Sequence, residues 1–176
     1  MTCRTPPDPH RPVPDEAALA ARASELLPVA IRRQLWTLFF DADDVQLPMM
    51  VPFEGISEWP SPRAVDDWGV ALEAVVAEFH VAWLAFVVER PGASTASESD
   101  LAWRDALLAL GATGGLVVRS VLGCSDDGVT SWSAQGARTS DQSDERARVI
   151  SRAVARQTRG QSSPRRLALA EVLPLR

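Results

Sequence analysis

The chain contains no lysine, and all 18 of its basic residues are arginine. Such Arg-only usage, rich also in Ala and Val, is typical of proteins encoded by GC-rich bacterial genomes. Cysteine is scarce as well, because Cys3 and Cys124 are the only two and lie 121 positions apart. This excludes a disulfide framework and a CxxC metal or redox motif. No apolar run approaches the ~20 residues of a membrane-spanning helix, so we expect no membrane partner.

Several sequence signatures of enzymes and of export are missing. The only histidines are His10 and His80, and neither lies near a serine that it could activate as a nucleophile. The chain has no G-x-x-x-x-G-K-[ST] and no G-x-G-x-x-G phosphate-binding motif. Residues 1–14 contain five prolines and lack the apolar core of a signal peptide, which favours a cytoplasmic location.

What remains is a composition ordinary for a globular domain: 176 residues, of which 46% are apolar and 23% charged. The charge is unevenly placed. Residues 41–131 hold four Arg and fifteen acidic residues, whereas residues 132–176 hold nine Arg and four acidic residues. The acidic middle argues against nucleic-acid binding by the central domain and leaves it open only for the basic C-terminal segment.

Hydrophobic periodicity predicts alternating helices and strands. Helical patterns cover residues 15–27, 64–79, 98–110 and 143–159, and strand patterns cover 33–40, 45–53, 81–88, 116–124 and the residues up to 133. The order α-ββ-α-β-α-ββ-α predicts an α/β fold, in detail an α+β mixed sheet with helices on its faces. Residues 81–88 read as a central strand, and Pro48 and Pro52 place the 45–53 strand at a sheet edge.

We therefore predict a single domain over residues 15–133. A disordered arm of residues 1–14 precedes it, and a loop, a basic helix and a flexible tail follow over residues 134–176. The basic face of that helix carries Arg148, Arg152, Arg156 and Arg159.

The central part of the chain, residues 32–133, resembles the RadC-like JAB domain, the bacterial branch of the MPN/JAMM fold. The resemblance rests on the order of local strings: Gly55 ends a hairpin, residues 61–65 (SPRAV) start a helix, and residues 83–87 (WLAFV) form an apolar strand. Residues 88–93 (VERPGA) then fall on the family's H-N-H-P-S-G box, and residues 96–101 (ASESDL) on its P-S-x-x-D box. Gly115 followed by Leu116, and a final hairpin ending in residues 130–132 (TSW), complete it.

In that family the two His and the Asp of these boxes bind zinc, and a zinc hydrolase needs three such ligands. The resemblance places Val88 and Arg90 at the His positions and Asp100 at the Asp position. Valine cannot bind a metal, and a guanidinium is a permanent cation. We therefore expect no metal, no other cofactor and no catalytic residue.

Four residues form a candidate vestigial pocket: Glu89, Arg90, Ser97 and Asp100. On the functional reading, the pocket binds a small ligand, or Glu89 or Asp100 acts as a general acid or base. On the structural reading, which we favour, an Arg90–Asp100 ion pair has replaced the metal. Ser97 and Asp100 would then also cap the helix that starts there.

Trp59 is the candidate interaction residue, because it lies in a Pro-rich loop and exposed tryptophans are enriched at interaction hot spots; the alternative is that its ring folds onto its own domain. Trp36, Trp68, Trp83 and Trp103 fall in predicted elements and are interpreted as core residues. JAB-like domains without metal ligands typically serve in protein assemblies. The resemblance thus implies an inactive protein-interaction or scaffold module with an unidentified protein partner, and it is compatible with a homodimer. The alternatives are a non-zinc enzyme or small-ligand binder, and a nucleic-acid accessory protein acting through the C-terminal arginines.

Overall fold

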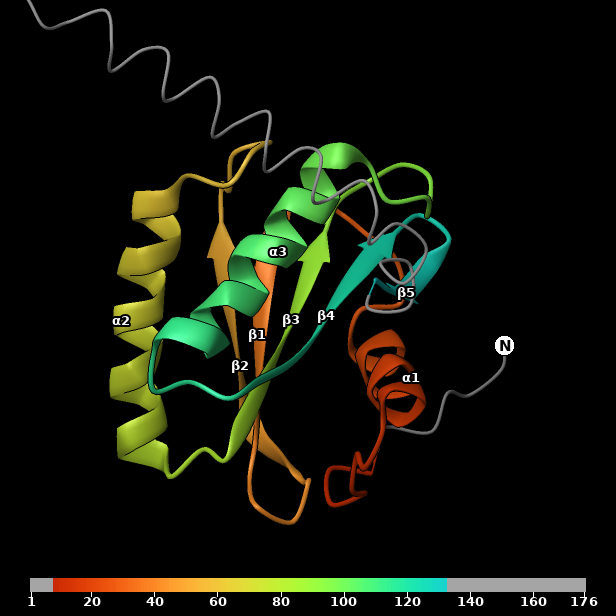
Figure 1. The fold of residues 1–176 in the computed structure, drawn as a ribbon. Helices are drawn as coiled ribbons and strands as arrows, with labels where there is room; N and C mark the ends of the chain where they lie inside the picture. The colour runs from red at the N-terminus through yellow and green to blue at the C-terminus, as the bar shows by residue number, and fades with distance from the viewer. Residues whose placement is uncertain (1–7, 133–176) are drawn as a thin grey trace, which may run out of the picture. The chain divides into compact units, whose positions relative to one another are not determined.

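The computed structural model describes residues 8–132 of the chain (Figure 1). These residues form α1 (Glu16–Leu26), β1 (Gln34–Phe40), β2 (Gln46–Glu54), α2 (Pro62–Phe79), β3 (Trp83–Glu89), α3 (Glu98–Thr113), β4 (Val118–Ser125) and β5 (Gly128–Ser131). The prediction of a mixed α/β domain, with helices flanking one mixed sheet, is confirmed.

The five strands form one sheet in the order β2-β1-β3-β4-β5. The β3–β4 pair is parallel and the other three pairs are antiparallel. All seven residues of β3 are buried, as the unbroken apolar run of the sequence predicts for a central strand. Strand β2, with Pro48 and Pro52, lies at the edge of the sheet, where a missing N–H costs no ladder hydrogen bond.

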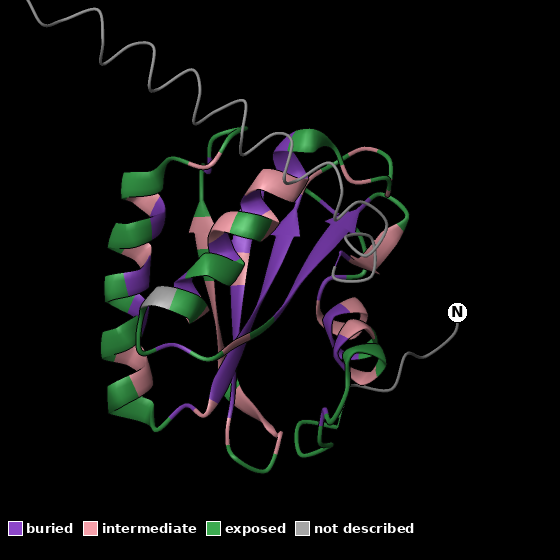
Figure 2. Cartoon of the chain, in the orientation of Figure 1, coloured by how far each residue is buried: buried purple, intermediate pink, exposed green. Residues whose placement is uncertain are grey.

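Each face of the sheet carries its own apolar cluster, and the alternation of side chains along β3 supplies both. Leu84, Phe86 and Val88 belong to the cluster under α2 and α3. Trp83, Ala85 and Val87 belong to the cluster under α1. Figure 1 shows α2 and α3 together beside one face and α1 apart from them, and Figure 2 shows their buried residues turned toward the sheet. The sheet is therefore covered on both sides.

A glycine in α2 allows α2 and α3 to pack closely against each other. Gly69 of α2 lies against Leu110 of α3, and a Cβ at Gly69 would stand 2.8 Å from the Leu110 Cδ2 atom. The two helices can approach this closely because position 69 has no side chain.

Helix α1 begins at the cap residue Asp15, whose carboxylate accepts the Ala18 N–H at 2.8 Å.

The prediction of a disordered arm over residues 1–14 is wrong for residues 8–14, while residues 1–7 lie outside the described part. Val13 is buried against the α1 face of the sheet. Arg22 of α1 is also buried, and its guanidinium donates to the carbonyl oxygens of Asp8 (2.7 Å) and Arg11 (3.1 Å). The prolines deprive this segment of regular structure, but Arg22 fixes its backbone through these carbonyls.

The predictions for residues 134–176, including the basic helix at 143–159, lie outside the described residues. Within residues 8–132, no helix has both the length and the apolar character needed to cross a membrane.

Candidate functional site

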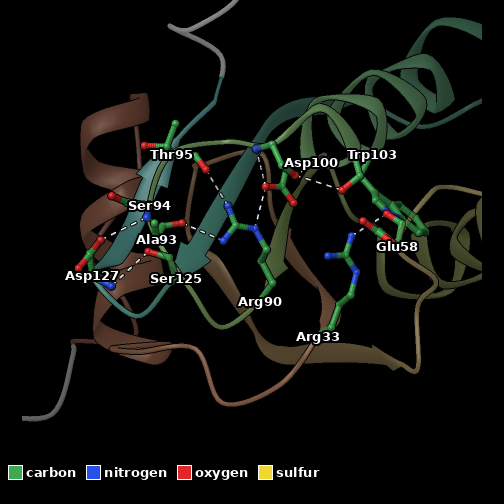
Figure 3. Close-up of polar contacts among 12 residues, drawn as sticks. Arg33, Glu58, Arg90, Ala93, Ser94, Thr95, Asp100, Trp103, Ser125 and Asp127 are labelled. Atoms are coloured by element: carbon green, nitrogen blue, oxygen red, sulfur yellow. Dashed lines mark hydrogen bonds and ion pairs between the residues drawn. The ribbon is translucent and has the colours of Figure 1, made fainter.

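The three positions that the resemblance assigns to zinc ligands lie on the α2/α3 side of the sheet, where β3 ends and α3 begins (Figure 3). Val88 is fully buried in the apolar cluster. Arg90 directly follows β3, and Asp100 is fully buried in the first turn of α3. The structure thus brings Arg90 and Asp100 together, as predicted.

The Arg90 guanidinium ties the loop between β3 and α3 to the helix. Its Nε donates to Asp100 Oδ2 at 2.7 Å. Its Nη1 and Nη2 donate, each at 2.8 Å, to the carbonyl oxygens of Ala93 and Thr95 (Figure 3). The Arg90 guanidinium therefore bonds to Ala93, Thr95 and Asp100 at once. Its planar set of N–H donors fixes the loop against the start of α3, which is a structural role.

Asp100 also takes part in a capping box with Ser97, as predicted for this helix start. The Ser97 N–H donates to Asp100 Oδ2 at 2.9 Å, and the Asp100 N–H donates to Ser97 Oγ at 3.2 Å. The second oxygen, Oδ1, is buried and accepts no hydrogen bond from the described residues. With an isopropyl group at position 88 and a cation bound to the one carboxylate, these residues do not fit a zinc ion.

The prediction that Glu89 shares this pocket is wrong, because side chains alternate along a strand and Glu89 belongs to the opposite face. Its Oε1 accepts the backbone N–H groups of Ile31 (2.6 Å) and Arg32 (3.2 Å). Its Oε2 accepts from Gln34 Nε2 (2.6 Å) and Trp36 Nε1 (2.7 Å). We call these four donors the Glu89 nest.

The four donors of the Glu89 nest favour the ionised form of the Glu89 carboxylate. Burial raises the pKa of Glu89, but the hydrogen bonds from Trp36, Ile31, Gln34 and Arg32 outweigh it, so the pKa lies below its ordinary value of 4.5. A carboxylate held ionised and bonded through both oxygens is a poor proton donor and a weak base. This geometry favours a structural role for Glu89.

Cys124 lies beside Glu89, as its partner in the parallel register of β3 and β4. Burial, with a further contribution from the Glu89 charge, raises the pKa of the Cys124 thiol to about 11. Its Sγ contacts the Leu27 carbonyl oxygen at 3.5 Å. Burial and a raised pKa both disfavour the reactive thiolate, so this geometry argues against Cys124 as a nucleophile.

The space next to Val88 is occupied by an indole ring. Gly123 pairs with Val88 in the sheet, and a Cβ on Gly123 would stand 2.2 Å from Cζ2 of Trp132. Trp132 is itself buried, and its carbonyl oxygen accepts from Arg104 of α3 at 3.3 Å. Aromatic packing therefore fills the region beside the predicted ligand positions.

Trp59 lies in a loop whose backbone is held by side chains from other elements. Arg33 donates to the carbonyl oxygens of Ser57 (3.2 Å) and Glu58 (2.7 Å), and Trp103 Nε1 donates to the same two oxygens at 3.2 Å each. The Ser57 hydroxyl donates to the Trp59 carbonyl oxygen. The Trp59 side chain nevertheless remains 52% exposed, so a fixed backbone presents a large aromatic ring to solvent.

The other predicted interaction residues, Arg148, Arg152, Arg156 and Arg159, lie outside the described residues. Within residues 8–132, no group of three or more His, Cys, Asp or Glu side chains is arranged to hold a metal ion. No known protein family matches the chain in a family-level comparison, and no curated protein matches it in sequence.

Two arrangements were missed by the sequence reasoning. The Glu89 nest draws on residues more than fifty positions away, and only the alternation of Gln34 and Trp36 along β1 hints at it. The fixed loop below Trp59 depends on Arg33 and Trp103, and no local pattern links these residues to positions 57 and 58.

Proposed function

We propose that this chain is a catalytically inactive JAB-like domain that acts as a protein-interaction or scaffold module. The observation that carries the proposal is the Arg90–Asp100 ion pair, which occupies two of the three positions that the resemblance assigns to zinc ligands. The third position is the buried Val88. A domain with Val88 and Arg90 at these positions lacks the three ligands of a zinc hydrolase, which supports a role in protein interaction over hydrolysis.

Trp59 supports the interaction role. Tryptophan is enriched among residues that dominate binding energy at interfaces. A ring on a backbone already fixed by Arg33 and Trp103 loses little conformational entropy when a partner covers it. We therefore place the partner-binding surface around Trp59, on the loop that leads into α2.

The alternative of a non-zinc enzyme loses support, because Glu89 lies on the other face from Arg90 and is bonded by four donors. The alternative of nucleic-acid binding through the C-terminal arginines stays a prediction from the sequence.

Restoring the ligands tests the inactive-site half of the proposal. The double variant Val88→His with Arg90→His would present two imidazoles beside Asp100, whose Oδ1 accepts no hydrogen bond within residues 8–132. We expect the double variant to bind about one zinc per chain and to gain thermal stability with zinc, and the native chain and the single variant Val88→His to do neither. The alignment of the two boxes is wrong if the double variant binds no zinc, and the inactive site is refuted if the native chain binds zinc and cleaves isopeptide or peptide bonds.

The interaction half is tested by partner capture with matched variants. Trp59→Ser removes the exposed ring, and Val70→Ser changes a side chain of similar exposure on α2. We expect proteins that co-purify with the native chain to be lost with Trp59→Ser and kept with Val70→Ser. Equal capture by all three chains would refute the Trp59 surface.

A further inference from the structure

Residues 58 and 59 present a carboxylate next to an aromatic ring on one fixed stretch of backbone. Trp59 is 52% exposed, and Glu58 is exposed as well. Within residues 8–132, the Glu58 carboxylate takes part in no hydrogen bond or ion pair. The Glu58 carbonyl oxygen, in contrast, accepts from Arg33 and Trp103, which holds the loop in place (Figure 3). The loop therefore offers a ring and an acid to a partner on a backbone that is already ordered.

The arginines around this loop have partners other than the Glu58 carboxylate among the described residues. Arg32 forms an ion pair with Glu54, and Arg63 pairs with an aspartate of its own helix at 3.8 Å. Arg33 donates from Nε and Nη2 to main-chain carbonyl oxygens of the loop. The Glu58 carboxylate is thus left for a cation from outside the domain.

The described domain carries a large negative charge. Residues 8–132 contain 19 acidic residues and 8 arginines, a net charge of −11 with neutral histidines. A field of one sign raises the local concentration of oppositely charged partners and speeds their association, and it disfavours partners of the same sign. A partner that covers Trp59 therefore approaches an acidic domain, which favours a basic partner.

We propose that the surface around Trp59 binds an arginine-bearing basic segment of a protein partner, with one guanidinium stacked on the Trp59 ring and paired with the Glu58 carboxylate. Arginine fits both groups at once, because its planar guanidinium stacks on aromatic faces and offers several N–H donors to a carboxylate. Lysine carries a compact, strongly hydrated charge that suits this pair of groups less well. The partner chemistry rests on the interaction role proposed for Trp59 and makes it more specific.

The test is a titration of the full chain with three capped heptapeptides, in which glycine alternates with arginine, with lysine or with glutamate. Backbone amide shifts and the indole N–H shift of Trp59 follow binding at low ionic strength, where screening is weak. We expect saturable binding of the arginine peptide, binding of the lysine peptide that is weaker by about threefold or more, and none of the glutamate peptide. The absence of a saturable shift with the arginine peptide, or equal binding of the arginine and lysine peptides, would overturn the proposal.

Three variants locate the contact. Trp59→Leu keeps an apolar side chain without the ring and should weaken the arginine peptide about fivefold, and Glu58→Gln should weaken it about threefold. Glu78→Gln is the matched control, since it removes the same charge from an exposed position near the far end of α2 and should change nothing. Equal weakening by Glu58→Gln and Glu78→Gln would show that net charge alone acts, which contradicts the proposal.

Partner capture separates the arginine contact from the wider interaction role. The arginine contact predicts that proteins captured by the native chain are reduced with Glu58→Gln and are displaced by the arginine peptide. Capture that is lost with Trp59→Ser, yet is complete with Glu58→Gln and resists the peptide, would refute the arginine contact and leave the interaction role in place. Capture that is equal for the native chain and Trp59→Ser would refute both.

Discussion

Arg90 Nε donates to Asp100 Oδ2 at 2.7 Å, and this ion pair joins the end of β3 to the first turn of α3. Asp100 is fully buried and the Arg90 side chain is 15% exposed, so solvent screens the pair little. The guanidinium is thus the counter-charge of a buried carboxylate, and its removal has a predictable cost.

Arg90→Leu should lower the free energy of unfolding by about 2–4 kcal/mol, because it leaves the Asp100 carboxylate buried without compensation. The matched control is Arg63→Leu, which removes an exposed pair with Asp67 at 3.8 Å and should cost less than about 0.5 kcal/mol. Urea unfolding of the two variants measures the difference. Equal midpoints would show that the Arg90–Asp100 pair does not stabilise the fold.

Glu89→Gln should destabilise the domain by about 2–3 kcal/mol, because an amide NH₂ would face N–H donors that now contact a charged acceptor. Glu58→Gln, on the exposed loop, is the control and should leave the stability unchanged. Chemical unfolding at pH 7 provides the comparison. A Glu89→Gln chain as stable as the native one would mean that the Glu89 nest contributes nothing.

The stability advantage that Glu89 confers should depend on pH in a defined direction. The folded pKa of Glu89 lies below its ordinary value of 4.5, so the unfolded chain binds a proton there more readily than the folded chain. The advantage is therefore complete above the ordinary pKa and is lost as the pH falls through the lower, folded pKa. Unfolding of the native chain and of Glu89→Gln from pH 7 to pH 2.5 should show a gap that is constant at first and then closes. A gap that widens in acid would reverse the sign that we assign.

Cys124 should resist thiol reagents while the domain is folded. With a thiol pKa of about 11, the thiolate fraction at pH 8 is about one in a thousand, and burial adds a further barrier. In a Cys3→Ser chain, the reaction with a disulfide reagent should be at least 100-fold slower than that of glutathione, and urea should remove the difference. A rapid reaction without urea would place Cys124 at the surface.

Gly123→Ala should destabilise the domain by about 1–3 kcal/mol, because the added methyl group would overlap the Trp132 ring. Gly115→Ala is the matched control, since a Cβ there meets no atom within 4 Å. Thermal unfolding of the two variants compares them. If Gly123→Ala unfolds at the same temperature as Gly115→Ala, Trp132 does not pack on β4 as described.

Most of the secondary structure was predictable from local patterns. The apolar run of β3 predicted a central strand, because a strand buried on both faces needs apolar residues throughout. The prolines of β2 predicted an edge strand, because proline has no N–H to donate. Ser97 and Asp100 were predictable as a cap for the same reason, since a capping box spans only three residues. The ordered segment at residues 8–14 was not, because it depends on the carbonyl contacts of Arg22.

The candidate site was predictable only in part. The Arg90–Asp100 pair spans ten residues and followed from the resemblance, whereas the separation of Glu89 from Arg90 follows from strand alternation and was overlooked. In the parallel pair of β3 and β4, Leu84 faces Val118 and Ala85 faces Ser120, which leaves Arg119 without a residue opposite; this shift depends on pairing across more than thirty residues. No local property of the sequence marks a residue as the extra one in such a pair.

The contacts of Glu89 and of Glu16 also determine when α1 can complete its packing during synthesis. Ile31, just after α1, donates to Glu89, 58 positions later, and Glu16 accepts from Ser131, 115 positions later. Of the helices in residues 8–132, α1 is synthesised first, yet its contacts are complete only after β3 and β5 have emerged. Until then, the apolar side of α1, with Leu19 and Ala23, has no sheet to cover it. Contacts between residues so far apart in the sequence slow folding, so we expect the described domain to complete its fold only once β5 has been synthesised.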